Sequence, residues 1–341
     1  MKKVLVFGLN HFHYLTSFIN SLESLGCLTT VCKYSIIDKK KKSKSEREKY
    51  YESYRNSLMK QIGGKDIFIN FCGNYFYDII DKNTLELMRK NGIFCVSVYI
   101  DSIHRYENIN QNLNLYDEVY CFEKKDLSDF SGLNVRLKYL PVGVAESFFN
   151  TREESDIKYD VSFVGGLSEE KRLECLDEVA AFCHNTGKKM IVFGGGVWNQ
   201  SDNFWKKTFK KIKFQLQYKY LSKCYVNREL SVYEINKLFC NTLINMNIHV
   251  PGHTGLNPRT FEILYNENFM LCDYRVDANE EGFIDGENIA FYYSTKDCID
   301  KIKFYLCNPD RRIDIAQKGA ILVREKYTET ALLKNNFYFL R

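Results

Sequence analysis

Asn257 to Tyr274, with the sequence NPRTFEILYNENFMLCDY, is the stretch that decides the fold. Asn257 can accept hydrogen bonds from the first free amides of a helix, and Pro258 suits the next position because its missing N–H would be unsatisfied there anyway. Phe269 to Cys272 form a short apolar run before Asp273, which is typical of a buried strand. The stretch therefore predicts a capped helix followed by a buried strand, at a corner where a ligand binds.

Arg259 and Glu262 lie at i, i+3 spacing in this predicted helix, so both side chains share one face of its first turn. Helix N-termini favour anions, and in a charged pair there the cation can bind the phosphate of a ligand while the carboxylate binds its hydroxyls. The alternative is an ordinary capped helix with a surface ion pair, since most exposed pairs of this kind contribute little. The segment alone leaves both interpretations open.

Strand and helix patterns alternate through the rest of the chain in two series. The first series has strands near residues 4–7, 28–32, 66–71, 94–99 and 118–122, and the second restarts near Asp160 with YDVSFVGG and MIVFGGG. This alternation predicts mainly parallel sheets, and 341 residues suit two domains. We expect domains at residues 1–150 and 151–325, with residues 326–341 as a last helix that crosses back to the first domain.

Composition limits the class of protein. The chain is 45% hydrophobic, but no apolar run approaches the ~20 residues of a membrane span, and the first residues lack the features of a signal peptide. The twelve cysteines form no C-x-x-C pair, which indicates reduced thiols in a cytoplasmic protein. A net charge of +5 permits an anionic ligand or a membrane surface without calling for nucleic acid. The absence of Walker A and G-x-G-x-x-G patterns argues against an NTPase and an NAD(P) enzyme.

Several short motifs follow one another in the second half of the chain: VSFVGG, VFGGGVW, LINMNIH, NPRTFE, GFIDGENIAFY and IAQKGAILVREKYT. As an ordered set over residues 159 to 330, they resemble the C-terminal domain of the CgeB-like (spore maturation protein B-like) glycosyltransferases. The resemblance implies an α/β GT-B fold, in which two Rossmann-like domains face a central cleft. It also implies transfer of a sugar from a nucleotide diphosphate sugar to a hydroxyl of a cell-envelope glycan, glycolipid or protein. A sugar-nucleotide 2-epimerase of the same architecture and a non-catalytic nucleotide-sugar-binding protein are the alternatives.

The resemblance also implies a donor site. Its residues would be Gly165, Gly166, Arg172, Gly195, Trp198, Asn245, His249, Asn257, Arg259 and Glu262. Glu262 would bind the ribose, while Arg259 with Lys171 or Arg172 would hold the diphosphate. No metal or other cofactor is expected, because helix N-termini and cations generally stabilise the leaving diphosphate in GT-B enzymes.

Stereochemistry and the catalytic base stay open in the sequence. Many retaining GT-B enzymes carry a second glutamate eight residues before the one that binds ribose, and Thr254 stands there. If the reaction inverts the sugar, a base must come from the N-terminal domain. Asp101, His13 and His104 follow predicted strands there and are the candidates, although a histidine after a strand is more often structural.

The stretch FWKKTFKKIKFQLQYKYLSK carries apolar residues at helical spacing, at Trp205, Phe209, Ile212, Leu216 and Tyr220. Five lysines lie among them. The pattern fits either a helix with a core stripe and a solvated face, or an interfacial helix on an anionic membrane. A shorter lysine run at residues 39–42 indicates a loop that leads into a solvated helix, with a membrane-contacting patch as the alternative.

Overall fold

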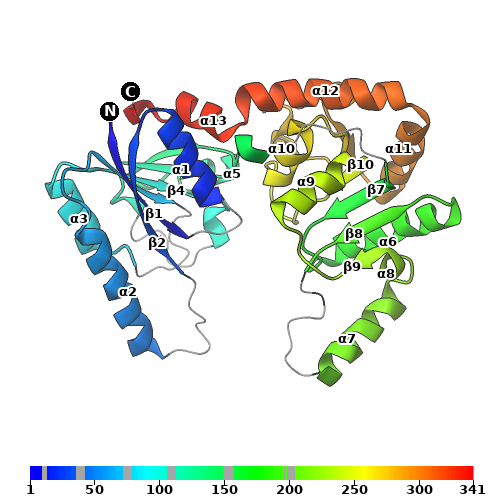
Figure 1. Cartoon of the computed structure of the whole chain (residues 1–341), viewed down its shortest axis with the longest axis horizontal. Helices are drawn as coiled ribbons and strands as arrows, with labels where there is room; N and C mark the ends of the chain where they lie inside the picture. The colour runs from blue at the N-terminus through cyan, green and yellow to red at the C-terminus, as the bar shows by residue number, and fades with distance from the viewer. Residues whose placement is uncertain are drawn as a thin grey trace. The chain divides into compact units, whose positions relative to one another are not determined.

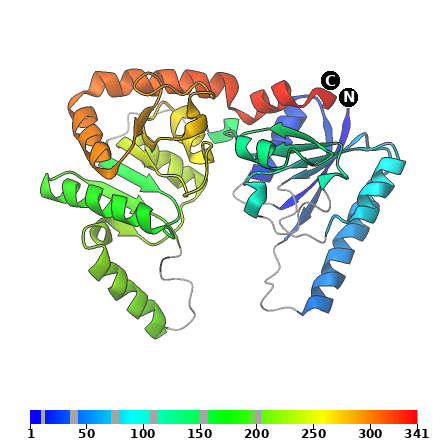
Figure 2. The same ribbon diagram turned by 180° about the vertical axis from the view of Figure 1, so that it is seen from behind.

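The computed structural model describes residues 1–9, 14–35, 43–71, 79–105, 113–148, 157–195, 197 and 204–340. The chain forms two compact units. Unit 1 comprises Met1–Ser147 together with Tyr327–Arg341, and unit 2 comprises Phe148–Lys326. The last helix of the chain therefore belongs to the same unit as the first strand (Figure 1 and Figure 2).

Unit 1 is built on a parallel sheet of six strands in the order β2-β1-β3-β4-β5-β6. The strands are β1 (Lys3–Leu9), β2 (Leu28–Tyr34), β3 (Ile67–Phe71), β4 (Phe94–Val98), β5 (Glu118–Cys121) and β6 (Arg136–Tyr139). All residues of β3 are buried, as expected of a strand whose sheet is covered on both faces. The predicted alternation of this half is confirmed.

Short helices connect these strands. They are α1 (Tyr14–Ser24), α2 (Lys44–Met59), α3 (Lys82–Lys90) and α5 (Lys124–Asp129), with 3₁₀ turns η1 (Ile103–Arg105) and η2 (Glu146–Phe148). Ser43 and Glu46 form a reciprocal capping box at the start of α2. The lysine run at residues 39–42 lies outside the described residues.

The C-terminal segment of unit 1 consists of α13 (Glu329–Asn336) and η4 (Tyr338–Leu340). Helix α13 packs on α1, where the carboxylate of Glu329 accepts a hydrogen bond from the hydroxyl of Ser17. A Cβ added at Gly143 would lie 2.6 Å from the carbonyl oxygen of Tyr327, so only glycine allows this close approach. The segment is thus part of the packing of unit 1.

Unit 2 has a second parallel sheet of six strands, in the order β12-β11-β10-β7-β8-β9. The strands are β7 (Tyr159–Val164), β8 (Met190–Phe193), β9 (Tyr225–Val226), β10 (Thr242–Asn247), β11 (Met270–Asp273) and β12 (Ala290–Tyr292). In chain order this is the 3-2-1-4-5-6 arrangement of a Rossmann fold. The prediction of two Rossmann-like α/β sheets is confirmed.

The helices of unit 2 are α6 (Glu170–Asn185), α7 (Phe204–Gln217), α8 (Leu221–Cys224), α9 (Val232–Cys240), α10 (Pro258–Tyr265), α11 (Thr295–Cys307) and α12 (Pro309–Lys326), with the turn η3 (Val276–Ala278). Helix α6 packs against α11, whereas α10 packs against α9 and α12. Among the described helices, none is both long and apolar enough to cross a membrane.

Candidate functional site

The strand order of unit 2 reverses between β7 and β10. From β7 the chain proceeds outward to β8 and β9, and it then returns to β10 on the other side of β7. Ligands of open α/β sheets bind beside such a reversal, outside the carboxyl ends of the strands. The residues that follow β7 and β10 are therefore the first place to look for a site.

Arg172 joins the carboxyl ends of these two strands. It lies in the first turn of α6, and its guanidinium donates to the carbonyl of Gly166 after β7 and to that of Ile248 after β10. Its side chain is 7% exposed, and burial lowers its pKa, an effect that the nearby carboxylate of Asp273 opposes. An arginine has five N–H donors, and Nε of Arg172 has no partner among the described residues. The two hydrogen bonds therefore fix the guanidinium of Arg172 where the strand order reverses, and they leave some of its N–H donors available for a ligand.

A pocket of about 420 Å³ lies beside Arg172. Three cations and one carboxylate line it: Lys171, Arg172, Arg275 and Asp273. Helix α11 begins at its rim, where Ser294 caps the helix by accepting from the N–H of Asp297 at 3.2 Å. An excess of positive charge beside a helix N-terminus favours an anion such as a phosphate.

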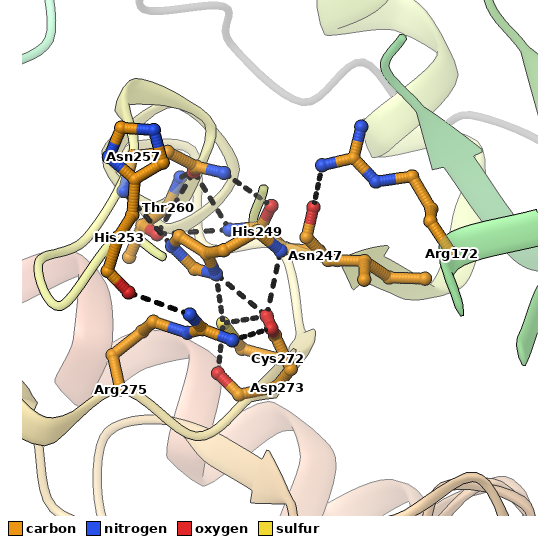
Figure 3. A network of polar contacts seen from close by, with 10 residues as sticks. Arg172, Asn247, His249, His253, Asn257, Thr260, Cys272, Asp273 and Arg275 are labelled. Carbon is orange, nitrogen blue, oxygen red and sulfur yellow. Dashed lines mark hydrogen bonds and ion pairs between the residues drawn. The ribbon is translucent and has the colours of Figure 1, made fainter. Parts of the chain in front are cut away.

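His249 holds the loop after β10 in place (Figure 3). Its Nε2 accepts from the backbone N–H of Asn257 at 3.0 Å, so the proton lies on Nδ1, which donates to Asp273 at 2.7 Å. Burial lowers the pKa of His249, which keeps the ring neutral. Both ring nitrogens are thus engaged within the protein, and the geometry makes His249 a residue that positions the loop.

Asn257 caps α10, as the sequence predicts. Its Oδ1 accepts from the N–H of Thr260 at 3.2 Å, and Pro258 occupies the first helical position. The amides of Asn257 and Asn247 also exchange two hydrogen bonds of 3.0 Å each (Figure 3). The end of β10 and the start of α10 are therefore tied together by side chains.

Arg275 closes the network on the side of β11. It donates to the carbonyl of His253 at 2.8 Å and pairs with Asp273, while its Nε has no partner within the described residues. Burial disfavours ionisation of Asp273, but the hydrogen bonds from His249 and the charge of Arg275 outweigh it and lower the pKa of this carboxyl.

His249, Cys272 and Asp273 are residue types that bind metals, and their ligand atoms lie within 4.8 Å of one another. The hydrogen bonds of His249 and the ion pair with Arg275 already account for this arrangement. Moreover, a guanidinium on the same carboxylate opposes a second cation. The cluster fits a structural hydrogen-bond network better than a metal centre.

Arg259, in the first turn of α10, pairs with Glu262, which lies three residues further along the helix. Their side chains are 22% and 14% exposed, and the guanidinium of Arg259 lies over the ring of Phe239 in α9, 5.5 Å from its centroid. Burial raises the pKa of Glu262, and the charge of Arg259 offsets this only in part. The structure brings these two residues together, but neither lines the pocket beside Arg172.

Solved structures with similar folds cover nearly the whole chain. Sucrose-phosphate synthase from Thermosynechococcus elongatus has a TM-score of 0.68 at 9% identity, with 99% of this chain and 98% of that one covered. HepE from Anabaena, in a complex with UDP and glucose, has a TM-score of 0.67 at 12% identity, with 100% and 99% covered. A glycosyltransferase from Rickettsia africae has a TM-score of 0.67 at 10% identity, with 99% and 97% covered.

The chain has the GT-B fold. Residues 173–334 also match the family described as glycosyl transferase-like, so the match begins in α6 and runs through the rest of unit 2 into α13. No curated protein sequence matches the chain. The family match and the GT-B fold together support a glycosyltransferase.

The two glycine loops of this GT-B protein pack against each other. A Cβ added at Gly194 would lie 2.2 Å from the carbonyl oxygen of Gly165, and one at Gly195 would lie 2.9 Å from the side chain of Glu229. A Cβ at Gly166 would meet nothing within 4 Å. Packing thus explains Gly194, whereas Gly166 leaves open space beside Arg172.

Asn245, a predicted donor-site residue, does not line the pocket beside Arg172. Asn245 is fully buried within unit 2, where it accepts from Ser162 at 2.8 Å and donates to the carbonyls of Phe239 and Phe269. The structure therefore gives Asn245 a place in the core of the unit rather than at the pocket. Trp198 and His13 lie outside the described residues.

The catalytic candidates of the GT-B N-terminal unit follow β4. Nε2 of His104 lies 2.7 Å from a carboxylate oxygen of Asp129 in α5, and its side chain is half exposed. Asp101 accepts from the N–H of Ser102 at 3.0 Å. A histidine bonded to a carboxylate has the geometry of a general base whose ring orientation is fixed.

Arg275 and Tyr292 line the pocket and were not predicted. Arg275 is two residues beyond the strand that ends at Asp273. A cation soon after a buried strand is the sequence pattern that could have indicated its place at the site. The hydroxyl of Tyr292 is buried without a partner among the described residues, and the sequence carries no signal for it.

Proposed function

We propose that this protein is a CgeB-like glycosyltransferase that uses a nucleoside diphosphate sugar as donor and a hydroxyl of a cell-envelope glycan, glycolipid or protein as acceptor. The observation that carries the proposal is the position of Arg172, which is anchored across the strand reversal of unit 2 beside a pocket rich in cations. A diphosphate is the anion that fits several cations and a helix N-terminus in one pocket.

In this proposal Lys171, Arg172 and Arg275 bind the diphosphate, and the free space beside Gly166 receives one of its phosphates. Glu262 binds the ribose, as the sequence predicts. Arg259, which is expected from the sequence to hold the diphosphate, is proposed instead to hold the Glu262 carboxylate in position. Gly195 and Trp198 lie next to the base or ribose in this proposal, as the sequence predicts. The solved complexes of HepE with UDP and with UDP-glucose support uracil as the first base to test.

The reaction breaks the bond between the anomeric carbon of the sugar and the diphosphate oxygen, and forms a bond from that carbon to the acceptor oxygen. The acceptor hydroxyl loses its proton to a base, for which we propose His104 with Asp129, and Asp101 is the second candidate. The cations of the pocket stabilise the negative charge that develops on the leaving diphosphate, so the proposal includes no metal ion.

We propose the cytoplasm as the place of this activity. The eleven described cysteines form no disulfide, and nine of them are buried. Buried free thiols are usual in proteins of a reducing compartment.

Thermal unfolding with a panel of nucleosides, nucleoside diphosphates and nucleotide sugars tests the proposal. One nucleoside diphosphate should raise Tm clearly more than its nucleoside, because stabilisation grows with occupancy and reaches about 2.7 kcal/mol at a hundred times Kd. Release of that diphosphate from its sugar should then depend on an added acceptor. If no member of the panel shifts Tm, the proposed donor site is wrong; if the donor is converted without an acceptor, an epimerase replaces the transferase.

A further inference from the structure

Helix α7 exposes an apolar stripe to solvent. Trp205, Phe209, Ile212 and Leu216 repeat at i, i+4, i+7 and i+11, which places them on one face of the helix. They are 77%, 69%, 49% and 80% exposed. The stripe therefore does not contribute to a core, and the interpretation of α7 as a helix with a buried apolar stripe is wrong for these four residues.

The opposite face of α7 attaches the helix to unit 2. Phe214 is buried and packs against the rings of Tyr218 and Tyr225 in tilted arrangements, at 5.3 Å between ring centroids in each case. Because Phe214 is two positions from Ile212 and from Leu216, it lies about half a turn of the helix away from the stripe. The anchor thus turns the stripe outward, and α7 extends away from the sheet of its unit (Figure 1).

Lysines flank the exposed stripe. Helix α7 carries Lys206, Lys207, Lys210, Lys211 and Lys213 and no acidic residue. The whole chain has 48 Lys and Arg against 43 Asp and Glu, so the charge of this one helix equals the net charge of the protein. Among the described helices, α7 is the most cationic, so the apolar stripe lies among lysines.

We infer that α7 docks the protein on an anionic lipid bilayer, with Trp205, Phe209, Ile212 and Leu216 in the headgroup region and the lysines on the lipid phosphates. Helices with aromatic and aliphatic residues on one face and lysines beside them lie in the plane of such interfaces. A second copy of the chain fits this face less well, because pairing two such stripes would bring two sets of five lysines together. The inference names a partner surface and stands independently of the donor site.

Sedimentation of the full chain with vesicles tests this docking. With vesicles of equal parts phosphatidylglycerol and phosphatidylcholine, the protein should pellet at low salt and be released at high salt, because screening weakens the contact. Pure phosphatidylcholine vesicles should retain much less protein. A protein that stays in the supernatant with anionic vesicles at low salt overturns the inference.

Two variants and a matched control assign the contact to α7. Lys210→Gln, Lys211→Gln and Lys213→Gln together should lower the vesicle partition coefficient on the order of 100-fold, at about fivefold per lysine. The control replaces Lys158, Lys188 and Lys189, three exposed lysines at the amino edge of the sheet of unit 2, and should bind as the wild type does. Equal effects of the two triple variants would show that only net charge matters and would overturn the assignment.

The second variant, Phe209→Ser with Leu216→Ser, should also lose binding while Tm is unchanged, since both side chains are already exposed. Light scattering identifies the alternative occupant: a dimer in the wild type that this variant abolishes would assign the stripe to a second copy and overturn the lipid inference. Vesicle binding needs no nucleotide, and nucleotide binding needs no vesicle, so each proposal can fail separately.

Discussion

Asp273 accepts two hydrogen bonds from His249 on a single carboxylate oxygen, one from the backbone N–H at 3.0 Å and one from Nδ1 at 2.7 Å. His249, the second residue after β10, is thereby fixed to the last residue of β11. With Nε2 of His249 bound to the N–H of Asn257, the loop that leads to α10 has its conformation set by one buried imidazole.

Asp273→Asn should therefore destabilise unit 2 by about 1.5–3 kcal/mol at pH 7.5, the range for a lost hydrogen bond to a charged group. Acid should weaken the wild type as well. The pKa of His249 in the fold lies below its ordinary value of about 6.5, so the unfolded chain binds a proton first and stability falls as pH falls below that value. Thermal unfolding at pH 7.5 and 5.5 measures both effects. Asp300→Asn, in an exposed ion pair, serves as control, and a similar loss in both variants would contradict the prediction.

Lys171→Gln should weaken binding of the nucleoside diphosphate by roughly fivefold to tenfold, since one exposed cation near a phosphate contributes about 1 kcal/mol. Binding of the free nucleoside should not change. Calorimetric titration of both ligands measures the difference. Lys188→Gln is the matched control, because Lys188 is also exposed but lies at the amino edge of the same sheet. Equal losses for the two ligands would mean that Lys171 does not contact the diphosphate.

Arg259 and Glu262 should behave as one unit in donor binding. Glu262→Ala is expected to lose about 2 kcal/mol or more of donor affinity, the value of a charge-assisted hydrogen bond. Arg259→Ala should cost nearly as much, because it leaves Glu262 without its partner, and the double variant should lose little more than either single one. A double-mutant cycle on donor Kd checks this. Additive losses would show that Arg259 binds the donor independently of Glu262.

His104→Ala should lower kcat by roughly 10²–10⁴-fold and leave the donor Kd unchanged, as expected of a general base. Asp129→Asn should lower kcat less than His104→Ala does, because the carboxylate orients the ring of His104. His184→Ala, an exposed histidine of α6, is the control. Full activity of His104→Ala would transfer the role to Asp101 or His13.

Glu329 should make unit 1 less stable as pH rises. Burial raises its pKa to about 8. The folded state therefore binds a proton that the unfolded chain has lost, and stability falls as pH rises from about 4.3, the ordinary value, to about 8. Glu329→Gln should remove this loss, and Tm at pH 6 and pH 8 measures it. Glu325→Gln, an exposed glutamate of α12, should keep the pH dependence of the wild type.

Local patterns predicted the fold because they depend on neighbouring residues. The cap at Asn257 and the strand that ends at Asp273 are both present, since capping and apolar alternation act within a few residues. The expectation of a GT-B fold came from the family resemblance that the ordered motifs carry, and structural comparison confirms the fold.

The site was harder to predict because its contacts join distant segments. Arg172 reaches Ile248 across 76 positions, and no spacing in the sequence indicates that its donors are used by two carbonyls. Asn245 was expected at the donor site because the family resemblance implies that the polar end of its strand, which also carries Asn247, contacts the donor. Asn245 lies two residues before Asn247, however, and at that position its side-chain amide lies among buried backbone carbonyls of unit 2.

Periodicity also could not decide which face of α7 is buried. The stripe that begins at Trp205 has more apolar residues than the opposite face of α7. Nevertheless, Phe214 on that opposite face is the residue that packs against unit 2. The spacing of apolar residues predicts an amphipathic helix, but it does not predict which face of the helix packs against the core of its unit.

The return of α13 to unit 1 sets an order for folding during synthesis. Unit 2 is one continuous segment, Phe148–Lys326, whereas unit 1 needs Tyr327–Arg341 as well as the first 147 residues. Domains generally fold as units during synthesis, and the first 147 residues of unit 1 are translated before any residue of unit 2. Unit 1 begins first and finishes last, because Ser17 meets Glu329 only after the whole of unit 2 has been translated.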